Sequence, residues 1–133
     1  MPGVTDDLVA MVGTEIGVSD WFELSADRIR RFNSVVGEPM SDRVSPFLLV
    51  SVLPGLLATV ASPLPAAQAS INYGLDRLEV KQLPAPGSRV RARVVLASID
   101  EVGTALQLKR RIVIEAETGE TVALVETLAR LVY

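Results

Sequence analysis

Two carboxylates, Glu38 and Asp42, lie close together in the sequence and are suited in type and spacing to acid–base chemistry. They could face each other across the mouth of a pocket, where burial would increase the proton affinity of one of them enough for proton transfer. The alternative is that both are exposed loop carboxylates, with Glu38 following one helix and Asp42 capping the next. Glu38 and Asp42 are the candidate catalytic residues.

Histidine and cysteine are both absent from the 133-residue chain, which restricts its chemistry further. The chain therefore has no imidazole proton shuttle, no thiolate nucleophile, no disulfide and no zinc–thiolate site. Any catalysis must use carboxylates, hydroxyls, tyrosine, lysine, arginine or backbone dipoles. We expect no metal site and no cofactor.

Four further polar residues are candidate substrate contacts: Asn33, Ser45, Asn72 and Tyr73. A tyrosine hydroxyl or an asparagine amide could form a hydrogen bond with a substrate carbonyl. Asn72 could instead serve a bulge or a turn, and Tyr73 could be structural. Ser45 precedes Pro46, a favourable pair for starting a helix, so capping explains Ser45 without a functional role.

The helix before Glu38 must position this carboxylate. Ser25 can cap the start of this helix, and Gly37 can end it. Residues 15–24, which precede the helix, are expected to be extended chain. The apolar positions of the helix recur at helical spacing: Ile29, Phe32, Val35 and Val36.

The segment after Ser45 is the most apolar part of the chain. Residues 47–61 carry no charge and are interrupted mainly by Pro54 and Gly55. As a helix rising ~1.5 Å per residue, the run would cover roughly 22 Å of a hydrocarbon core of about 30 Å, and Pro54 interrupts a longer helix. We therefore expect no membrane span, but a long apolar helix buried inside a wrapping sheet.

The second half of the chain has the alternation typical of strands. Turns are expected at Gly103 and Gly119. The strands are expected over residues 70–75, 89–100, 106–115 and 121–133. One apolar helix followed by hairpin-linked strands predicts an α+β fold in which an antiparallel sheet curls around the helix.

Length and charge limit the classes of protein that the chain can represent. Its length predicts one domain spanning residues 1–133. The formal net charge of −3 gives no reason to expect a nucleic-acid partner. The first residues lack a basic region followed by an apolar stretch, so we expect no secretory signal and a cytoplasmic location.

Three separated blocks of sequence carry a resemblance to a known family: residues 12–21 (VGTEIGVSDW), 71–77 (INYGLDR) and 87–92 (GSRVRA). Together they resemble the MaoC-like (R)-specific enoyl-thioester hydratases and dehydratases, which have the hotdog fold. The resemblance implies a dimer and a tunnel for the acyl chain of a coenzyme A or carrier-protein thioester. A homodimer is expected, with a heterodimer containing a MaoC-like homologue as the alternative.

The chain departs from the resembled family at the positions that carry its chemistry. The family uses an Asp and a His to move protons, and the N–H of a Gly to polarise the thioester carbonyl. Glu38 is in the place of the Asp, and the segment that should carry the His is shortened. Ser45 is in the place of a second His, and Pro46, which has no N–H, replaces the Gly.

A basic row is expected on the sheet, formed by Arg89, Arg91 and Arg93 and joined by Lys109, Arg110 and Arg111. It could attract coenzyme A phosphates or an acidic carrier protein. The alternative is a solvated sheet face. Arg110 differs from the others because it breaks the alternation of its strand.

Three functions remain open from the sequence. The first is a repurposed biosynthetic enzyme of cyclase, lyase or isomerase type, acting on a hydrophobic acyl or polyketide-like substrate with Glu38 as acid or base. The second is a non-catalytic subunit that pairs with an active MaoC-like hydratase. The third is a binding module for acyl chains, and fold alone does not decide among them.

Overall fold

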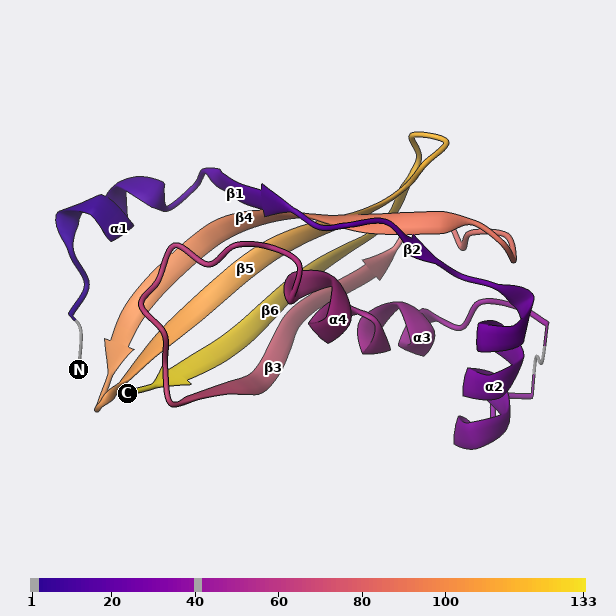
Figure 1. Ribbon diagram of the computed structural model, residues 1–133, viewed down its shortest axis with the longest axis horizontal. Helices are drawn as coiled ribbons and strands as arrows, with labels where there is room; N and C mark the ends of the chain where they lie inside the picture. Colours follow the sequence, from indigo (N-terminus) through magenta and orange to yellow (C-terminus); the bar gives the residue numbers. More distant parts are fainter. Residues whose placement is uncertain (1–2, 40–41) are drawn as a thin grey trace.

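The computed structural model describes residues 3–39 and 42–133. Its strands form one antiparallel sheet in the order β1-β4-β5-β6-β3, with β2 also paired to β4 (Figure 1). The strands are β1 (Glu15–Val18), β2 (Phe22–Glu23), β3 (Ala69–Val80), β4 (Arg89–Val102), β5 (Ala105–Ala116) and β6 (Thr121–Val132). The helices are α1 (Asp6–Met11), α2 (Ala26–Val36), α3 (Pro46–Ser51) and α4 (Leu53–Leu57).

The sheet curves, and α3 and α4 cover one of its faces, which we call the inner face (Figure 1). Alternate residues of β4 and β5 point into this face: Val90, Ala92 and Val94 on β4 are fully buried, as are Ile112 and Ile114 on β5. Gly103 and Gly119 lie at the expected hairpin turns with positive φ of 59° and 97°. The prediction of an α+β fold with an antiparallel sheet is confirmed.

The helix before Glu38 has the predicted bounds but buries a different set of side chains. The Ser25 side chain accepts a hydrogen bond from the Arg28 N–H at its start, and Gly37 adopts the left-handed conformation at its end. Ile29 is buried, but Val35 is 86% exposed. The predicted apolar face is therefore wrong at Val35 and Val36, which point to solvent at the last turn of α2, where Asn33 is the buried residue.

The expected long apolar helix over residues 47–61 is present as two short helices, α3 and α4. Pro54 lies in the first turn of α4, where the missing N–H of proline is tolerated and a continuous helix would lose a hydrogen bond. Leu49 and Leu53 pack into the core, whereas Phe47 is 67% exposed. Two short helices therefore cover the inner face, and only some of their apolar side chains are buried against it.

The remaining elements close the ends and one edge of the sheet. The β1 strand comes so close to the segment after α4 that a side chain at Gly17 would overlap Val60. At the opposite edge, β3 pairs only with β6, and ten of its twelve residues, 69–78, are exposed. No helix in the described part of the chain is long and apolar enough to cross a membrane.

Candidate functional site

Glu38 lies where α2 ends and faces the start of α3. Its backbone N–H donates to the Asn33 carbonyl at 2.9 Å, which fixes the turn after α2. The Ser45 hydroxyl donates to Glu38 Oε2 at 3.2 Å and accepts from the Phe47 N–H at 3.1 Å. Ser45 is therefore both the expected helix cap and a direct partner of the candidate catalytic carboxylate.

Asn33 holds the loop that brings Ser45 to Glu38. The Asn33 side chain is fully buried, and its amide Nδ2 donates to the Arg43 carbonyl at 2.9 Å. The structure thus places three of the predicted site residues, Asn33, Glu38 and Ser45, in one cluster. Asn33 contacts the protein backbone here, so its role in the cluster is to position the loop.

A hollow of about 190 Å³ opens beside this cluster and is lined by Glu38, Ser45, Pro46 and Leu83, with Arg43 and Val44. Asp42 is exposed and is not among the lining residues. Glu38 Oε1 has no hydrogen-bond partner among the described residues. Glu38 therefore accepts a hydrogen bond from a hydroxyl group and lines the hollow, whereas Asp42 does not line it.

The start of α3 offers no backbone donor to a substrate oxyanion. Pro46 occupies the first helical turn and has no N–H, and the Phe47 N–H is used by Ser45. The next N–H, of Leu48, donates to the Ser45 carbonyl at 3.0 Å. Chemistry at Glu38 must therefore proceed without stabilisation from these amides.

Asn72 and Tyr73 lie elsewhere, in a cavity of about 260 Å³ between α3, α4, β3 and β6. The Tyr73 ring is half exposed and is covered by the Arg130 guanidinium, 4.0 Å from its centroid. The other lining residues are largely apolar: Val50, Leu53, Pro54, Leu57, Gly74, Leu75, Leu128, Arg110 and Thr127. The sequence therefore identified one wall of the cavity.

Sequence reasoning missed the opposite wall, where Arg110 lies on the inner face rather than in the outer basic row. Arg110 lies on the same side of β5 as its buried neighbours in the alternation, Leu108 and Ile112. The signal in the sequence is the position of Arg110 among the inward residues of the alternation. Arg110 also lines two neighbouring hollows, of about 90 and 280 Å³.

Arg110 and Thr127 each carry a buried polar atom that no described residue satisfies. The two residues are directly opposite each other on β5 and β6. Arg110 Nε and Thr127 Oγ1 are buried and have no hydrogen-bond partner among the described residues. Burial lowers the pKa of the Arg110 guanidinium from its ordinary value, because desolvation disfavours the charged form.

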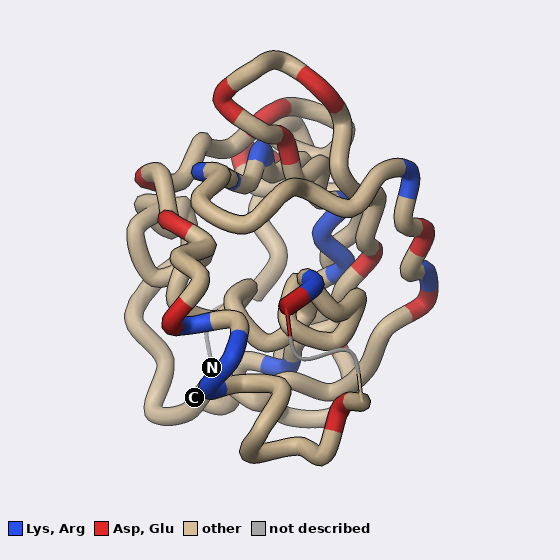
Figure 2. Tube along the Cα trace, turned by 90° about the vertical axis from the view of Figure 1, so that its right-hand side faces the viewer, with Lys and Arg blue, Asp and Glu red and all other residues tan. Residues whose placement is uncertain are grey.

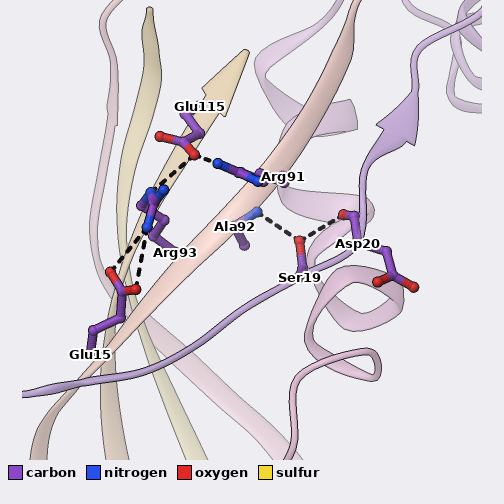
Figure 3. A network of polar contacts seen from close by, with 7 residues as sticks. All are labelled: Glu15, Ser19, Asp20, Arg91, Ala92, Arg93 and Glu115. Atoms are coloured by element: carbon purple, nitrogen blue, oxygen red, sulfur yellow. Dashed lines mark hydrogen bonds and ion pairs between the residues drawn. The ribbon is translucent and has the colours of Figure 1, made fainter. Parts of the chain in front are cut away.

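Two arginines of the outer basic row, Arg91 and Arg93, are paired with acidic residues. Arg91 Nε and Arg93 Nε bind Glu115 Oε1 at 2.6 and 3.0 Å, and Arg93 Nη1 lies 3.3 Å from Glu15 (Figure 3). The Arg91 guanidinium also covers the Trp21 ring at 4.3 Å. These arrangements favour the solvated-face interpretation over a phosphate site.

The next outer positions on β5 are paired in the same way. Lys109 binds Asp76 at 2.6 Å, and Arg111 lies 3.5 Å from Glu126. The hydrogen bond to Asp76 raises the pKa of Lys109, since it favours the charged ammonium. Basic and acidic residues are accordingly interspersed over the molecule rather than gathered by sign (Figure 2).

The described residues contain no group of three or more acidic side chains placed to hold a metal ion. The polar groups that line the 190 Å³ hollow and the 260 Å³ cavity are a carboxylate, hydroxyls, an amide and guanidinium groups. Such groups are suited to hydrogen bonding with an organic ligand.

Comparison with curated proteins shows similarity to a dehydratase. No family model matches the sequence. The 3-hydroxyacyl-thioester dehydratase Z of Mycobacterium tuberculosis is 28% identical over 115 residues, which cover 73% of this chain and 74% of the relative. The similarity therefore extends over most of both chains.

Solved structures give the fold. A MaoC-like dehydratase from Rhodospirillum rubrum superposes with a TM-score of 0.72 at 17% identity, covering 91% of this chain and 92% of the other. The (R)-hydratase of A. caviae has a TM-score of 0.64 at 21% identity (90% and 98% covered), and a chain of the HadBC (3R)-hydroxyacyl-ACP dehydratase complex of Mycobacterium tuberculosis has 0.64 at 15% (90% and 99%). The chain thus has the hotdog fold of the MaoC-like dehydratases and (R)-hydratases, and its resemblance to them is confirmed.

Proposed function

We propose that this protein is a repurposed hotdog enzyme that binds a hydrophobic acyl or polyketide-like substrate beside α3 and moves a proton with Glu38. The observation that carries the proposal is the Glu38–Ser45 pair, which holds a carboxylate at a hollow with one oxygen unpartnered among the described residues. The apolar cavity lined by Val50 of α3 and by residues of α4 supports binding of the hydrophobic part of the substrate.

The chemistry of the site favours a substrate that needs little activation. Removing a proton next to a thioester carbonyl leaves an enolate, whose charge a hydratase of this fold stabilises with a backbone N–H. At the start of α3, Pro46 has no N–H and the Phe47 N–H already donates to Ser45, so neither can stabilise the enolate. A C–H group between two carbonyls, as in a polyketide-like chain, spreads the charge over both oxygens and suits a lone carboxylate base.

The reaction class follows from what happens after Glu38 takes the proton. Reprotonation at another carbon is isomerisation, loss of a β-hydroxyl as water is elimination, and attack of the enolate on a carbonyl of the same chain is cyclisation. In each case Glu38 returns its proton to the product or to the leaving oxygen. Glu38 positioned beside a bound chain is the shared requirement.

The test is deuterium uptake from D₂O at the carbon next to the thioester, followed by mass spectrometry. The probes are 3-oxoacyl and 3-hydroxyacyl thioesters of N-acetylcysteamine. We expect Glu38→Gln to lower the exchange rate at least about a hundredfold, because general acid–base catalysis contributes roughly 10²- to 10⁴-fold. Glu117→Gln, at the exposed β5–β6 turn, is the matched control and keeps the wild-type rate.

The same assay decides the role of Asp42. If Asp42→Asn slows exchange as Glu38→Gln does, both carboxylates take part; if it keeps the wild-type rate, Glu38 acts alone. Exchange that survives Glu38→Gln unchanged would contradict the proposed mechanism. Urea unfolding of each variant separates lost chemistry from lost structure.

A second candidate is a non-catalytic subunit, and the exposed edge strand β3 favours it. The outer edge of β3 has no strand beside it in the described chain, and Ile71, Tyr73 and Leu75 are about half exposed. An unprotected, apolar edge is a template for pairing with another chain. The chain contains no histidine, so a partner of the same fold would have to supply one.

Native mass spectrometry distinguishes a self-sufficient homodimer from a mixed pair. The protein is measured alone and after mixing with a histidine-bearing hotdog homologue. Exchange activity of the isolated homodimer would exclude the subunit function, and activity that appears only in the mixture would establish it. Ile71→Lys on the free edge should weaken either pairing.

A further inference from the structure

The inner face of the sheet is not continuously apolar. One cluster of buried residues includes Ile112, and a second includes Leu96 and Leu108. Arg110 lies between them, since it occupies the inward position of β5 between Leu108 and Ile112 and pairs across to Leu96 on β4. A positive charge therefore interrupts the core at the point where an aliphatic side chain would join the two clusters.

No acidic side chain among residues 3–39 and 42–133 pairs with this charge. Arg110 forms no ion pair with any residue in the described ranges, and its Nε is buried without a hydrogen-bond partner there. Thr127, directly opposite on β6, has a buried Oγ1 in the same condition. Unsatisfied buried polar groups destabilise a fold, so two facing each other on neighbouring strands indicate a site for an absent partner.

The surroundings define what that partner must be. Among the described residues that line the 260 Å³ cavity and the two hollows next to it, Arg110 is the one cation. A single guanidinium matches a single negative charge, and its planar fork fits the two oxygens of a carboxylate. The cavity walls are mainly aliphatic, and its volume is close to the roughly 300 Å³ at the lower end for small-molecule sites.

We propose that Arg110 and Thr127 bind the carboxylate of a small apolar acid whose hydrocarbon part fills the cavity between α3, α4 and β3. The guanidinium donates two hydrogen bonds to the carboxylate, and the Thr127 hydroxyl donates a third. The Asn72 amide, which lines the same cavity, is a further donor within the site.

This inference rests on the proposed function only for the identity of the cavity as the substrate site, and it adds a free carboxylate to the substrate class. The hydrophobic molecule turned over at Glu38 would then carry an acid group at the end that enters the cavity. The depressed pKa of Arg110 agrees with a guanidinium that lacks an anion in the protein alone.

The test is a titration of the full chain with sodium octanoate and, separately, with octanamide, followed by isothermal calorimetry. The two probes have the same shape and differ in charge. We expect octanoate to bind saturably and octanamide to bind at least about tenfold more weakly, because a hydrogen bond between charged groups contributes roughly the free energy of a tenfold change in affinity or more.

Two variants of neighbouring arginines complete the titration. Arg110→Gln should lower octanoate affinity at least about tenfold and leave octanamide unchanged. Arg111→Gln, one residue further on the same strand but on the outer face, is the matched control and keeps wild-type affinity for both probes. Equal binding of the two probes, no binding of either, or unchanged octanoate affinity in Arg110→Gln would each overturn the proposal.

A structural role for Arg110 is separated by urea unfolding. Octanoate should raise the unfolding midpoint of the wild type and leave that of Arg110→Leu unchanged. Without ligand, Arg110→Leu should unfold at a higher urea concentration than the wild type. A lower midpoint would mean that the arginine supports the fold, and it would overturn the proposal.

Glu38→Gln distinguishes this proposal from the proposed function. The variant should bind octanoate as the wild type does, since Glu38 lines a different hollow. Octanoate binding without proton exchange on any thioester would remove the enzyme proposal alone. Proton exchange that depends on Glu38, without octanoate binding, would remove the carboxylate site alone.

Discussion

The two faces of β5 treat their basic residues differently. On the outer face, Lys109 and Arg111 each meet a carboxylate, Asp76 on β3 and Glu126 on β6 respectively. On the inner face, Arg110 meets no acidic side chain of the described chain and lies among leucines and isoleucines. The outer charges are those of an ordinary solvated sheet, whereas the inner one is a charged residue at an apolar position. Such departures from the local pattern are expected at functional sites.

The largest expected effect on stability comes from replacing the inner arginine. Arg110→Leu removes a desolvated, unpaired charge and joins the two hydrophobic clusters, so the free energy of unfolding should rise by about 2 kcal/mol. Urea denaturation monitored by circular dichroism measures the change. A decrease in the free energy of unfolding would mean that the two faces do not differ as described.

On the outer face, the reverse result is expected for Glu115→Gln. This carboxylate is the shared partner of Arg91 and Arg93 and is largely buried by them (Figure 3). Losing it should lower the free energy of unfolding by about 1 kcal/mol, because two partly buried guanidinium groups lose a charged acceptor. Glu120→Gln at the β5–β6 turn is the control, and equal stability of the two variants would argue against the pairing.

Thr127→Val tests the inner face with a smaller change. The substitution keeps the shape of the side chain and replaces a buried, unpartnered hydroxyl by a methyl group. The free energy of unfolding should rise by up to about 1 kcal/mol, since no hydrogen bond within the described chain is lost. A clear loss of stability would show that the hydroxyl already has a partner in the folded protein.

The smallest effect is expected for Arg111→Gln. Its side chain is more than half exposed, and exposed ion pairs contribute about 0.5 kcal/mol or less. Thermal and urea unfolding should therefore be nearly unchanged. A large loss would indicate that the outer charges are a stabilising network rather than a solvated face.

Much of the fold could be predicted because local signals and burial agree along most of the chain. The alternation of Val90, Ala92 and Val94, the cap at Ser25 and the turns at Gly103 and Gly119 all appear as expected. The prediction of one long helix was wrong because the chain forms α3 and α4 separately, with Pro54 in the first turn of α4. The predicted burial of Val35 and Val36 was wrong because helical spacing does not reveal how much of a helix the core covers.

The site could be predicted only in part for a related reason. Glu38 and Ser45 were both expected as candidates from their residue types and the family resemblance, but the hydrogen bond between them was not predicted and is seen only in the folded chain. The cavity, in contrast, is made by β3, β5, β6 and two helices, which only the folded sheet brings together. From the sequence, Arg110 could lie on the outer face with Lys109 and Arg111, or on the inner face of the sheet. The pairing of β5 with β6 in the folded sheet decides between the two positions.

The most direct measurement of the difference between the two faces is a ¹H–¹⁵N spectrum of the arginine side-chain Nε–H groups during titration with octanoate. The Arg110 signal, assigned by its loss in Arg110→Gln, should shift strongly with octanoate and remain in place with octanamide, while the signals of Arg91, Arg93 and Arg111 stay unchanged. An Arg110 signal that does not respond, or outer-face signals that respond equally, would contradict a carboxylate site on the inner face.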